Sequence, residues 1–235
     1  MLKAVFFDLY ETLITEFIPD WQPGRSVPSR MGIDEDAFRA EWTKRQEARY
    51  PGAIPDYPSV LRAICRVLQH PIDENLIETL HQQRLAEKSR PFEQIEEAVL
   101  HTLRHIQDLG LQIGVISNCS PEEVAAWDAS PIPEWVDAAI FSCDVGYIKP
   151  QPKIYRLACA ELQVEPEECL YTGDGGSDEL TGAEKAGLRP YWATWFLDRW
   201  PQWKQDGPGR ERSKKFFRLK SLEELEIVVE KAVEE

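Results

Sequence analysis

A carboxylate and a hydroxyl group stand directly after the first apolar run of the chain. Residues 2–7 form a nearly continuous apolar stretch, Asp8 follows it, and Thr12 stands four residues later. A run without polar alternation predicts a strand buried on both faces, as in the centre of a parallel sheet. Ligands of open α/β sheets bind outside the carboxyl ends of the strands. Asp8 is therefore expected at the mouth of a cleft, with capping of the next turn as the alternative interpretation.

Other side chains that could take part in chemistry stand at the ends of later predicted strands. In chain order they are Ser117 and Asn118, then Lys149, and then Asp174 and Asp178 of the glycine-rich turn. Each signal is weak by itself, because a strand-end hydroxyl, a solvated lysine and a simple connector would look the same. Their order and spacing together favour one site at one edge of a sheet.

The elements that must position these residues alternate between strand and helix after residue 92. The expected strands cover residues 2–7, 111–116, 138–142, 169–172, 191–195 and 216–219. The expected helices cover residues 95–109, 152–162 and 178–186, with short helical starts at Ser120 and Ser221. Such alternation predicts an α/β fold with a parallel sheet.

A helical insert is expected between the first strand and this alternating part. Residues 17–28 are rich in proline and turn residues, which suits a linker. Helices are expected over residues 34–49, 57–69 and 73–88, and no strand signal occurs there. The predicted organisation is a core domain of residues 1–16 and 90–235 with a helical domain of residues 17–89 inserted into it.

The composition is that of an ordinary globular protein, and the net charge argues against nucleic acid and acidic membranes as partners. With 235 residues and a formal charge of -14, the chain has no basic surface for nucleic acid or an acidic membrane. The cluster of Arg210, Arg212, Lys214 and Lys215 is too short and too mixed to change this. No apolar run reaches membrane-spanning length, and the N-terminus enters the fold without room for a signal peptide. Five scattered cysteines are expected to be reduced thiols, so the predicted location is cytoplasmic.

The four motifs together resemble the haloacid dehalogenase (HAD) superfamily, over nearly the whole chain. The resemblance implies a Rossmann-like doubly wound parallel sheet and makes the helical insert a cap domain. It implies Asp8 as the nucleophile, Thr12 as a positioning residue, and a site for a small anionic substrate. The implied substrate-binding residues are Ser117, Asn118 and Lys149, and the implied Mg²⁺ ligands are Asp8, the backbone carbonyl of Tyr10, Asp174 and Asp178.

The chemistry of such a set can be stated in physical terms. A carboxylate that attacks a phosphoryl group meets negative charge with negative charge, so Lys149 and a magnesium ion must neutralise the phosphate oxygens. Mg²⁺ prefers oxygen ligands, usually one or two carboxylates with phosphate and water. Water would then hydrolyse an aspartyl-phosphate formed on Asp8. The expected activity is that of a magnesium-dependent phosphatase acting on a small phosphate ester.

Tyr10 departs from the phosphatase pattern, which has an aspartate there as general acid and base. Its reference pKa of about 10 lets it donate a proton but not accept one at neutral pH. Slow turnover, or a substrate with a good leaving group, is therefore expected. The segment around Tyr10 instead resembles the branch that displaces halide from 2-haloacids without a metal, as do residues 42–46 and 117–121.

Two features favour the phosphatase over that branch. Thr43 stands where the branch typically has an arginine for halide, and Asp174 is retained where the branch generally has a small polar residue. Mutual repulsion of Asp174 and Asp178 beside Asp8 would be costly without a cation. The alternatives left open are a metal-independent 2-haloacid dehalogenase and a slow or non-catalytic binding protein of the same fold. The expected oligomeric state, for any of these functions, is a monomer or a homodimer.

Half of the tryptophans fall in one segment, residues 192–203. Packing at the core and its edge is the favoured interpretation. The alternative is an aromatic rim near the cleft or a partner surface, because Pro201, Gly207, Pro208 and Gly209 indicate an exposed loop.

Overall fold

A six-stranded parallel sheet forms the centre of the molecule in the computed structural model, which describes residues 1–19, 24–205 and 207–235. The strand order is β3-β2-β1-β4-β5-β6, so β1 lies between β2 and β4. This order places the first strand beside the point where the winding of the sheet reverses, and ligands bind at such points in doubly wound folds. The predicted α/β class with a Rossmann-like parallel sheet is confirmed.

The strands are β1 (Ala4–Phe7), β2 (Gln112–Ser117), β3 (Ala138–Phe141), β4 (Cys169–Gly173), β5 (Arg189–Ala193) and β6 (Arg218–Leu219). The α-helices are α1 (Val27–Met31), α2 (Glu35–Arg49), α3 (Tyr57–Val67), α4 (Glu74–Glu93), α5 (Glu97–Asp108), α6 (Pro121–Val124), α7 (Ser142–Val145), α8 (Pro152–Glu161), α9 (Glu179–Ala186), α10 (Gln202–Gln205), α11 (Pro208–Ser213) and α12 (Leu222–Glu234). Short 3₁₀ helices are η1 (Trp127–Ala129), η2 (Ile132–Trp135), η3 (Pro166–Glu168), η4 (Gly176–Asp178) and η5 (Leu197–Arg199).

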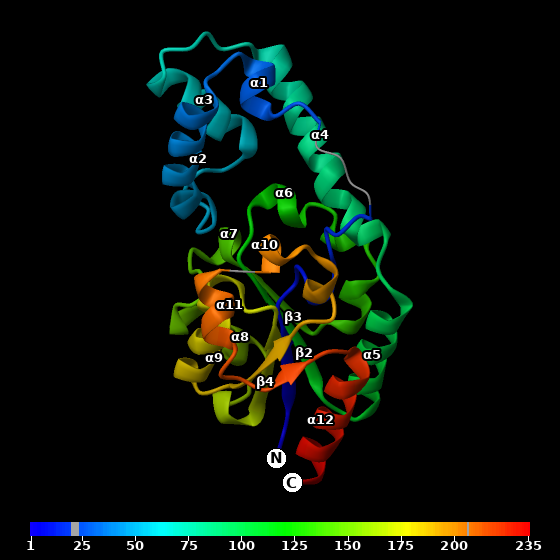
Figure 1. The fold of residues 1–235 in the computed structure, drawn as a ribbon. Helices are drawn as coiled ribbons and strands as arrows, with labels where there is room; N and C mark the ends of the chain where they lie inside the picture. The colour runs from blue at the N-terminus through cyan, green and yellow to red at the C-terminus, as the bar shows by residue number, and fades with distance from the viewer. Residues whose placement is uncertain (20–23, 206) are drawn as a thin grey trace.

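Helices cover both faces of the sheet, which explains why β1 has no polar alternation. Val5 and Phe7 belong to the apolar cluster shared with α5 and α12, whereas Ala4 and Phe6 belong to the cluster shared with α8 and α9. Figure 1 shows α5 and α12 on one side of the sheet and α8, α9 and α11 on the other. Both faces of β1 are buried, and the first polar side chain after the strand, Asp8, lies at the edge of the sheet.

Helices α1–α4 form a second, smaller lobe beyond the carboxyl edge of the sheet (Figure 1). Asp34, Asp56 and Asp73 each accept a hydrogen bond from a backbone amide of the first turn of α2, α3 and α4, as N-cap residues do. The lobe has its own apolar cluster, with Leu61 and Ile64 of α3 fully buried in it. The division of the chain at residues 16–17 and 89–90 stays a prediction, and α4 continues through the second point to Glu93. Part of the predicted linker, residues 20–23, lies outside the described residues.

The segment after β5 is more ordered than the sequence indicates. Instead of one exposed loop it contains α10 and α11, and Pro208 opens α11 at its first position, where a missing amide hydrogen costs nothing. Two tryptophans fasten the segment to the loop after β1. The indole of Trp195 donates to the carbonyl of Thr12 at 2.9 Å, and that of Trp200 donates to the carboxylate of Glu11 at 2.7 Å.

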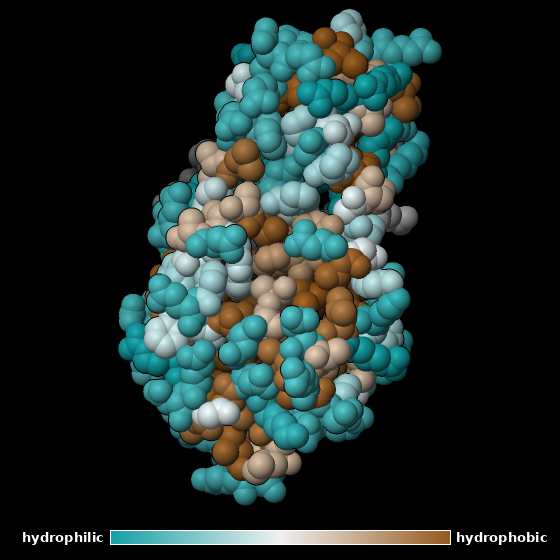
Figure 2. Space-filling view, turned by 180° about the vertical axis from the view of Figure 1, so that it is seen from behind, coloured by the Kyte–Doolittle hydropathy of each residue, from teal (hydrophilic) through white to brown (hydrophobic). Residues whose placement is uncertain are grey.

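Hydrophobic surface is scattered rather than gathered on the larger lobe. Figure 2 shows a mostly hydrophilic small lobe and several hydrophobic areas on the larger one, separated by hydrophilic residues. Phe217 and Ile227 are among the exposed large apolar side chains, and single residues of this kind are ordinary on protein surfaces. In the described part of the chain, no helix combines the length and the apolar character needed to cross a membrane.

Candidate active site

The sequence-predicted residues meet where the carboxyl ends of β1, β2 and β4 come together. Asp8 directly follows β1, Ser117 ends β2 and Asp174 directly follows β4. A small cavity of about 70 Å³ opens at this edge. It is lined by five predicted residues, Asp8, Tyr10, Ser117, Asn118 and Lys149, and by Gly176, Ser177 and Glu179. The cavity therefore has room for a group the size of a few water molecules.

Lys149 is the centre of a buried network of charged and polar groups. Its ammonium group lies 2.5 Å from Oδ1 of Asp8 and 2.6 Å from Oε2 of Glu179, and it donates to the Tyr171 hydroxyl at 3.2 Å. Tyr171 in turn donates to Oε2 of Glu179 at 2.7 Å. The Lys149 side chain is 2% exposed, so its charge is balanced by the two carboxylates rather than by solvent.

The burial of this network changes the titration of its members. Burial, together with the charge of Asp8, raises the pKa of Glu179 to about 8. Burial and the charge of Asp174 also raise the pKa of Asp8, against the opposing effect of Lys149. Burial alone would lower the pKa of Lys149, but the neighbouring carboxylates of Asp8 and Glu179 raise it above its ordinary value. Lys149 is therefore a cation at neutral pH.

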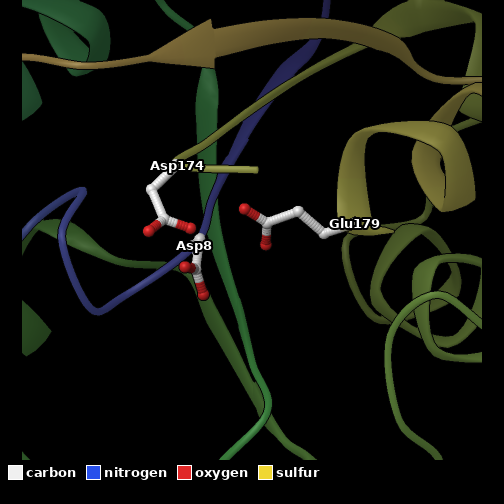
Figure 3. Close-up of side chains that lie close together, drawn as sticks. All are labelled: Asp8, Asp174 and Glu179. Atoms are coloured by element: carbon white, nitrogen blue, oxygen red, sulfur yellow. The ribbon is translucent and has the colours of Figure 1, made fainter. Parts of the chain in front are cut away.

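Three buried carboxylates converge on the end of β1. Asp8, Asp174 and Glu179 each offer an oxygen within 4.8 Å of the others. Figure 3 shows the three side chains directed toward a common centre, Asp8 and Asp174 from the strand ends and Glu179 from the start of α9. Asp178, expected from the sequence beside Asp174, is not a member of this group and forms an ion pair with Arg212, with 2.8 Å between Oδ1 and Nε.

The conformation of the turn after β4 explains why Glu179 enters the site. Ser177 and Asp178 both have left-handed backbone angles, with φ of 52° and 56°. Such angles are uncommon for residues other than glycine, and they gather at functional sites, where the surrounding structure holds them in place. Glu179 is fixed by the amide of Gly175, which donates to Oε1 at 2.9 Å. The sequence analysis missed Glu179, and the only signal was a second acid directly after Asp178.

Asp174 is neutralised by the protein itself. Its carboxylate accepts a hydrogen bond from the amide of Gly176 at 2.7 Å and forms an ion pair with Arg210 of α11. The indole of Trp192 donates to its carbonyl at 2.9 Å. Repulsion among the acids was expected to require a metal ion, but Arg210 and Arg212 also supply positive charge. The gathering of these acids therefore does not by itself require a metal ion.

The hydroxyl of Tyr10 already has a partner in this structure. It donates to the backbone carbonyl of Glu123 at 2.6 Å, and its ring lies edge-on to Phe92. Burial and the nearby charge of Glu123 raise the pKa of Tyr10 above its ordinary value. The phenol therefore keeps its proton at neutral pH and is directed at the main chain. It can protonate a leaving group only after the bond to Glu123 breaks.

Asn118 positions Lys149 from the neighbouring strand end. Its amide nitrogen donates to the Lys149 carbonyl at 2.9 Å, and its side-chain oxygen accepts from the Lys149 amide at 2.7 Å. Ser117 is buried and lines the cavity beside it. Thr12 is also buried, but the Thr12 hydroxyl has no hydrogen-bond partner within the described part of the chain and does not line the cavity. The carbonyl of Tyr10 stays a predicted ligand.

The small lobe is tied to the core by ion pairs beside this site. Glu123 of α6 accepts from Arg84 and Lys88 of α4, each at 3.3 Å. Glu122 pairs with Arg49 of α2, and this pair is buried, with 3% and 4% of the side chains exposed. Separating a buried pair leaves uncompensated charge, so the Arg49–Glu122 pair fastens the lobe to the core near the cavity.

The donor set of the site suits a divalent cation. Mg²⁺ is a hard ion that prefers oxygen ligands, and the three carboxylates of Asp8, Asp174 and Glu179 offer oxygens within reach of one another. The residues present therefore fit the cofactor that the family resemblance implies, with Glu179 as an acid that the sequence analysis did not include.

A family model for haloacid dehalogenase-like hydrolases matches residues 2–187 of this chain. The match covers most of the sequence and includes every candidate site residue. The chain belongs to this family, and it is a hydrolase by the same comparison. The resemblance drawn from the four motifs is confirmed.

The similar proteins include both phosphatases and dehalogenases. Glyceraldehyde 3-phosphate phosphatase of Methanopyrus kandleri is 26% identical over 80% of this chain and 82% of its own length. A 2-haloacid dehalogenase from Pseudomonas syringae matches the fold with a TM-score of 0.64 and 19% identity, over 98% of this chain and 99% of its own. A HAD phosphatase from Thermococcus onnurineus matches with a TM-score of 0.60 and 22% identity, over 97% and 98%. At these identities the two structures establish the shared fold.

Proposed function

We propose that the protein is a magnesium-dependent phosphatase that acts on a small phosphate ester. The observation that carries the proposal is the pair of buried acids, Asp174 and Glu179, gathered around Asp8. A nucleophile that attacks an uncharged carbon has no need of further carboxylates beside it, whereas phosphoryl transfer needs a cation held by such groups. The phosphatase relative from Methanopyrus kandleri supports the same choice.

In this proposal Asp8 is the nucleophile and Lys149 balances charge. A carboxylate oxygen of Asp8 attacks the phosphorus atom, the phosphorus–oxygen bond to the leaving group breaks, and the departing alkoxide takes a proton from solvent. Water then attacks the aspartyl-phosphate, which releases inorganic phosphate and restores the Asp8 carboxylate. Lys149 already contacts the Asp8 carboxylate, and Ser117 lines the cavity, so both can hold phosphate oxygens. Asp8, Asp174, Glu179 and the Tyr10 carbonyl would hold Mg²⁺, which supplies positive charge when bound. Asp178 supports the turn through Arg212.

The dehalogenase is the second candidate, and two observations favour it. Tyr10 occupies the position of the general acid and base, and its hydroxyl is bonded to the main chain. Asp174 already has an ion pair with Arg210, so the turn does not depend on a metal ion for charge balance. A 2-haloacid would place its carbon against Asp8 without the metal.

The test is a panel of small phosphate esters and 2-haloacids, each assayed with Mg²⁺ and with a chelator. The proposal predicts phosphate release that needs Mg²⁺ and disappears with the chelator. Halide release in the presence of chelator would establish the second candidate instead. Asp8→Asn is the control for both reactions, because any turnover that survives in this variant belongs to a contaminant.

A further inference from the structure

Helix α11 lies against the acidic turn that follows β4, and its two arginines contact the two aspartates of that turn. Arg210 forms an ion pair with Asp174, and Arg212 forms one with Asp178. The two arginines are two positions apart and the two aspartates four apart. These two ion pairs join α11 to a turn that lies more than thirty residues earlier in the sequence.

Two glycines let the helix approach the turn closely. A Cβ atom at Gly209 would lie 2.7 Å from the carbonyl oxygen of Gly175 and 2.8 Å from the amide nitrogen of Asp178. Gly175 has φ of 86°, and a side chain there would collide with Ser213. Backbone therefore packs on backbone at this contact. This packing fixes the backbone of Arg210 relative to Asp174. In an ordinary surface ion pair, by contrast, both side chains are mobile.

The Arg210–Asp174 pair is largely removed from solvent. Their side chains are 17% and 6% exposed, whereas those of Arg212 and Asp178 are 52% and 22% exposed. An ion pair with little solvent is screened less, and a buried carboxylate that loses its partner is costly. Arg210 thus gives Asp174 the positive charge that a bound cation would otherwise provide.

We propose that Arg210 competes with the divalent cation for Asp174 and so sets the affinity of the site for that cation. This inference rests on the proposed metal-dependent function. Both oxygens of the Asp174 carboxylate already have a partner, Arg210 at Oδ2 and the amide of Gly176 at Oδ1. A divalent cation bound through Asp174 would repel the guanidinium group, so its binding is expected to move Arg210 off the carboxylate. Part of the binding energy of the ion is spent on breaking that contact. Metal binding therefore loosens α11 from the turn.

Direct measurement of Mg²⁺ binding by calorimetry, without substrate, tests the inference. Arg210→Gln removes the competing charge and should bind Mg²⁺ about 10-fold more tightly than the unchanged protein, as expected for loss of a partly buried charge pair. Arg212→Gln is the matched control, because it removes the same charge from the same helix but from an aspartate outside the carboxylate group. Its affinity should change far less.

A second measurement does not depend on the variants. Hydrogen exchange of the unchanged protein should become faster in residues 208–213 when Mg²⁺ is added, because α11 loses a contact. Equal or weaker Mg²⁺ binding by Arg210→Gln, or an equal gain in Arg212→Gln, would overturn the inference and leave metal-dependent phosphatase activity standing. So would unchanged or slower exchange in α11. Absence of Mg²⁺ binding in both the unchanged protein and Arg210→Gln would overturn the proposed function and the inference together.

Discussion

The ammonium group of Lys149 lies 2.6 Å from the carboxylate of Glu179, and both side chains are almost completely buried. Glu179 thereby shares the lysine with Asp8, the candidate nucleophile. A single cation between two carboxylates couples their titration, because protonation of one strengthens the hold of the lysine on the other. The state of Glu179 therefore affects how strongly Lys149 is held by Asp8.

Glu179 should make the stability of the protein depend on pH. Its pKa is raised to about 8 in the folded state from an unfolded value of 4.5, so the folded protein holds this proton more tightly. The contribution to stability is complete below pH 4.5 and is lost as the pH rises toward 8. The free energy of unfolding should fall by up to about 1.4 kcal/mol per pH unit in this window from this group alone.

Glu179→Gln tests this expectation, because glutamine does not titrate. The free energy of unfolding, measured with urea between pH 5 and pH 8 at constant ionic strength, should depend less on pH in the variant than in the unchanged protein. Parallel profiles for the two proteins would mean that Glu179 is not the titrating group.

Asp8→Asn should abolish turnover of the true substrate and leave the fold intact. An amide is not a nucleophile, and asparagine has nearly the same size, so the loss should lie in the catalytic rate rather than in folding. The measurement is kcat together with the circular dichroism spectrum and the melting temperature. Near-normal activity in a pure, folded variant would rule out covalent catalysis by Asp8.

Asp174→Asn should raise the Mg²⁺ concentration needed for activity, by about 10-fold or more, because even indirect ligand contacts are commonly worth that much. Asp178→Asn should have a much smaller effect, since Asp178 pairs with Arg212 outside the carboxylate group. The measurement is activity against Mg²⁺ concentration for the two variants. Similar shifts for both would return Asp178 to the set of metal ligands.

Tyr10→Asp should speed phosphatase turnover, because aspartate can both protonate a leaving oxygen and activate water. The gain should be about 10-fold or more on an alkyl phosphate, a value at or below the low end of the usual range for general acid–base help. It should be small on an aryl phosphate, because the phenolate leaving group departs without protonation. Tyr10→Phe is the control and should change little, since the hydroxyl is directed at the Glu123 carbonyl. A folded, metal-bound Tyr10→Asp that is no faster on the alkyl ester would favour the dehalogenase.

Predictability from sequence differed between the sheet and the turn beside it. The apolar runs predicted the six described strands within a few residues. For β1, β2 and β4 the reason is that a parallel strand covered on both faces excludes polar side chains. The same logic brought Asp8, Ser117 and Asp174 to one edge. Glu179 was missed because the left-handed angles at Ser177 and Asp178 decide which of two adjacent acids points inward. No sequence pattern reports that choice.

The role of Arg210 was also beyond sequence reasoning, for a different reason. Gly207, Pro208 and Gly209 are common in loops, and the sequence analysis interpreted them in that way. In the structure, Pro208 begins a helix and Gly209 permits its close approach to the turn after β4. Both functions depend on tertiary contacts with a segment far away in the chain, which local patterns do not contain.

Helix α4 reaches from the far end of the small lobe to the core, with Pro91 in its last turn, and this length makes it a long arm. Twenty residues at 1.5 Å each give an arm of about 30 Å, so a tilt of about 10° about the Glu93 end would carry the Glu74 end through about 5 Å. Arg84 and Lys88 lie in the half of the arm nearest the pivot and would travel less than half as far. The buried pair of Arg49 and Glu122 joins α2 to the core away from this pivot, so a tilt of that size would separate two charges with almost no access to solvent. The length of α4 therefore makes the position of the whole lobe sensitive to the contacts that α6 makes with it.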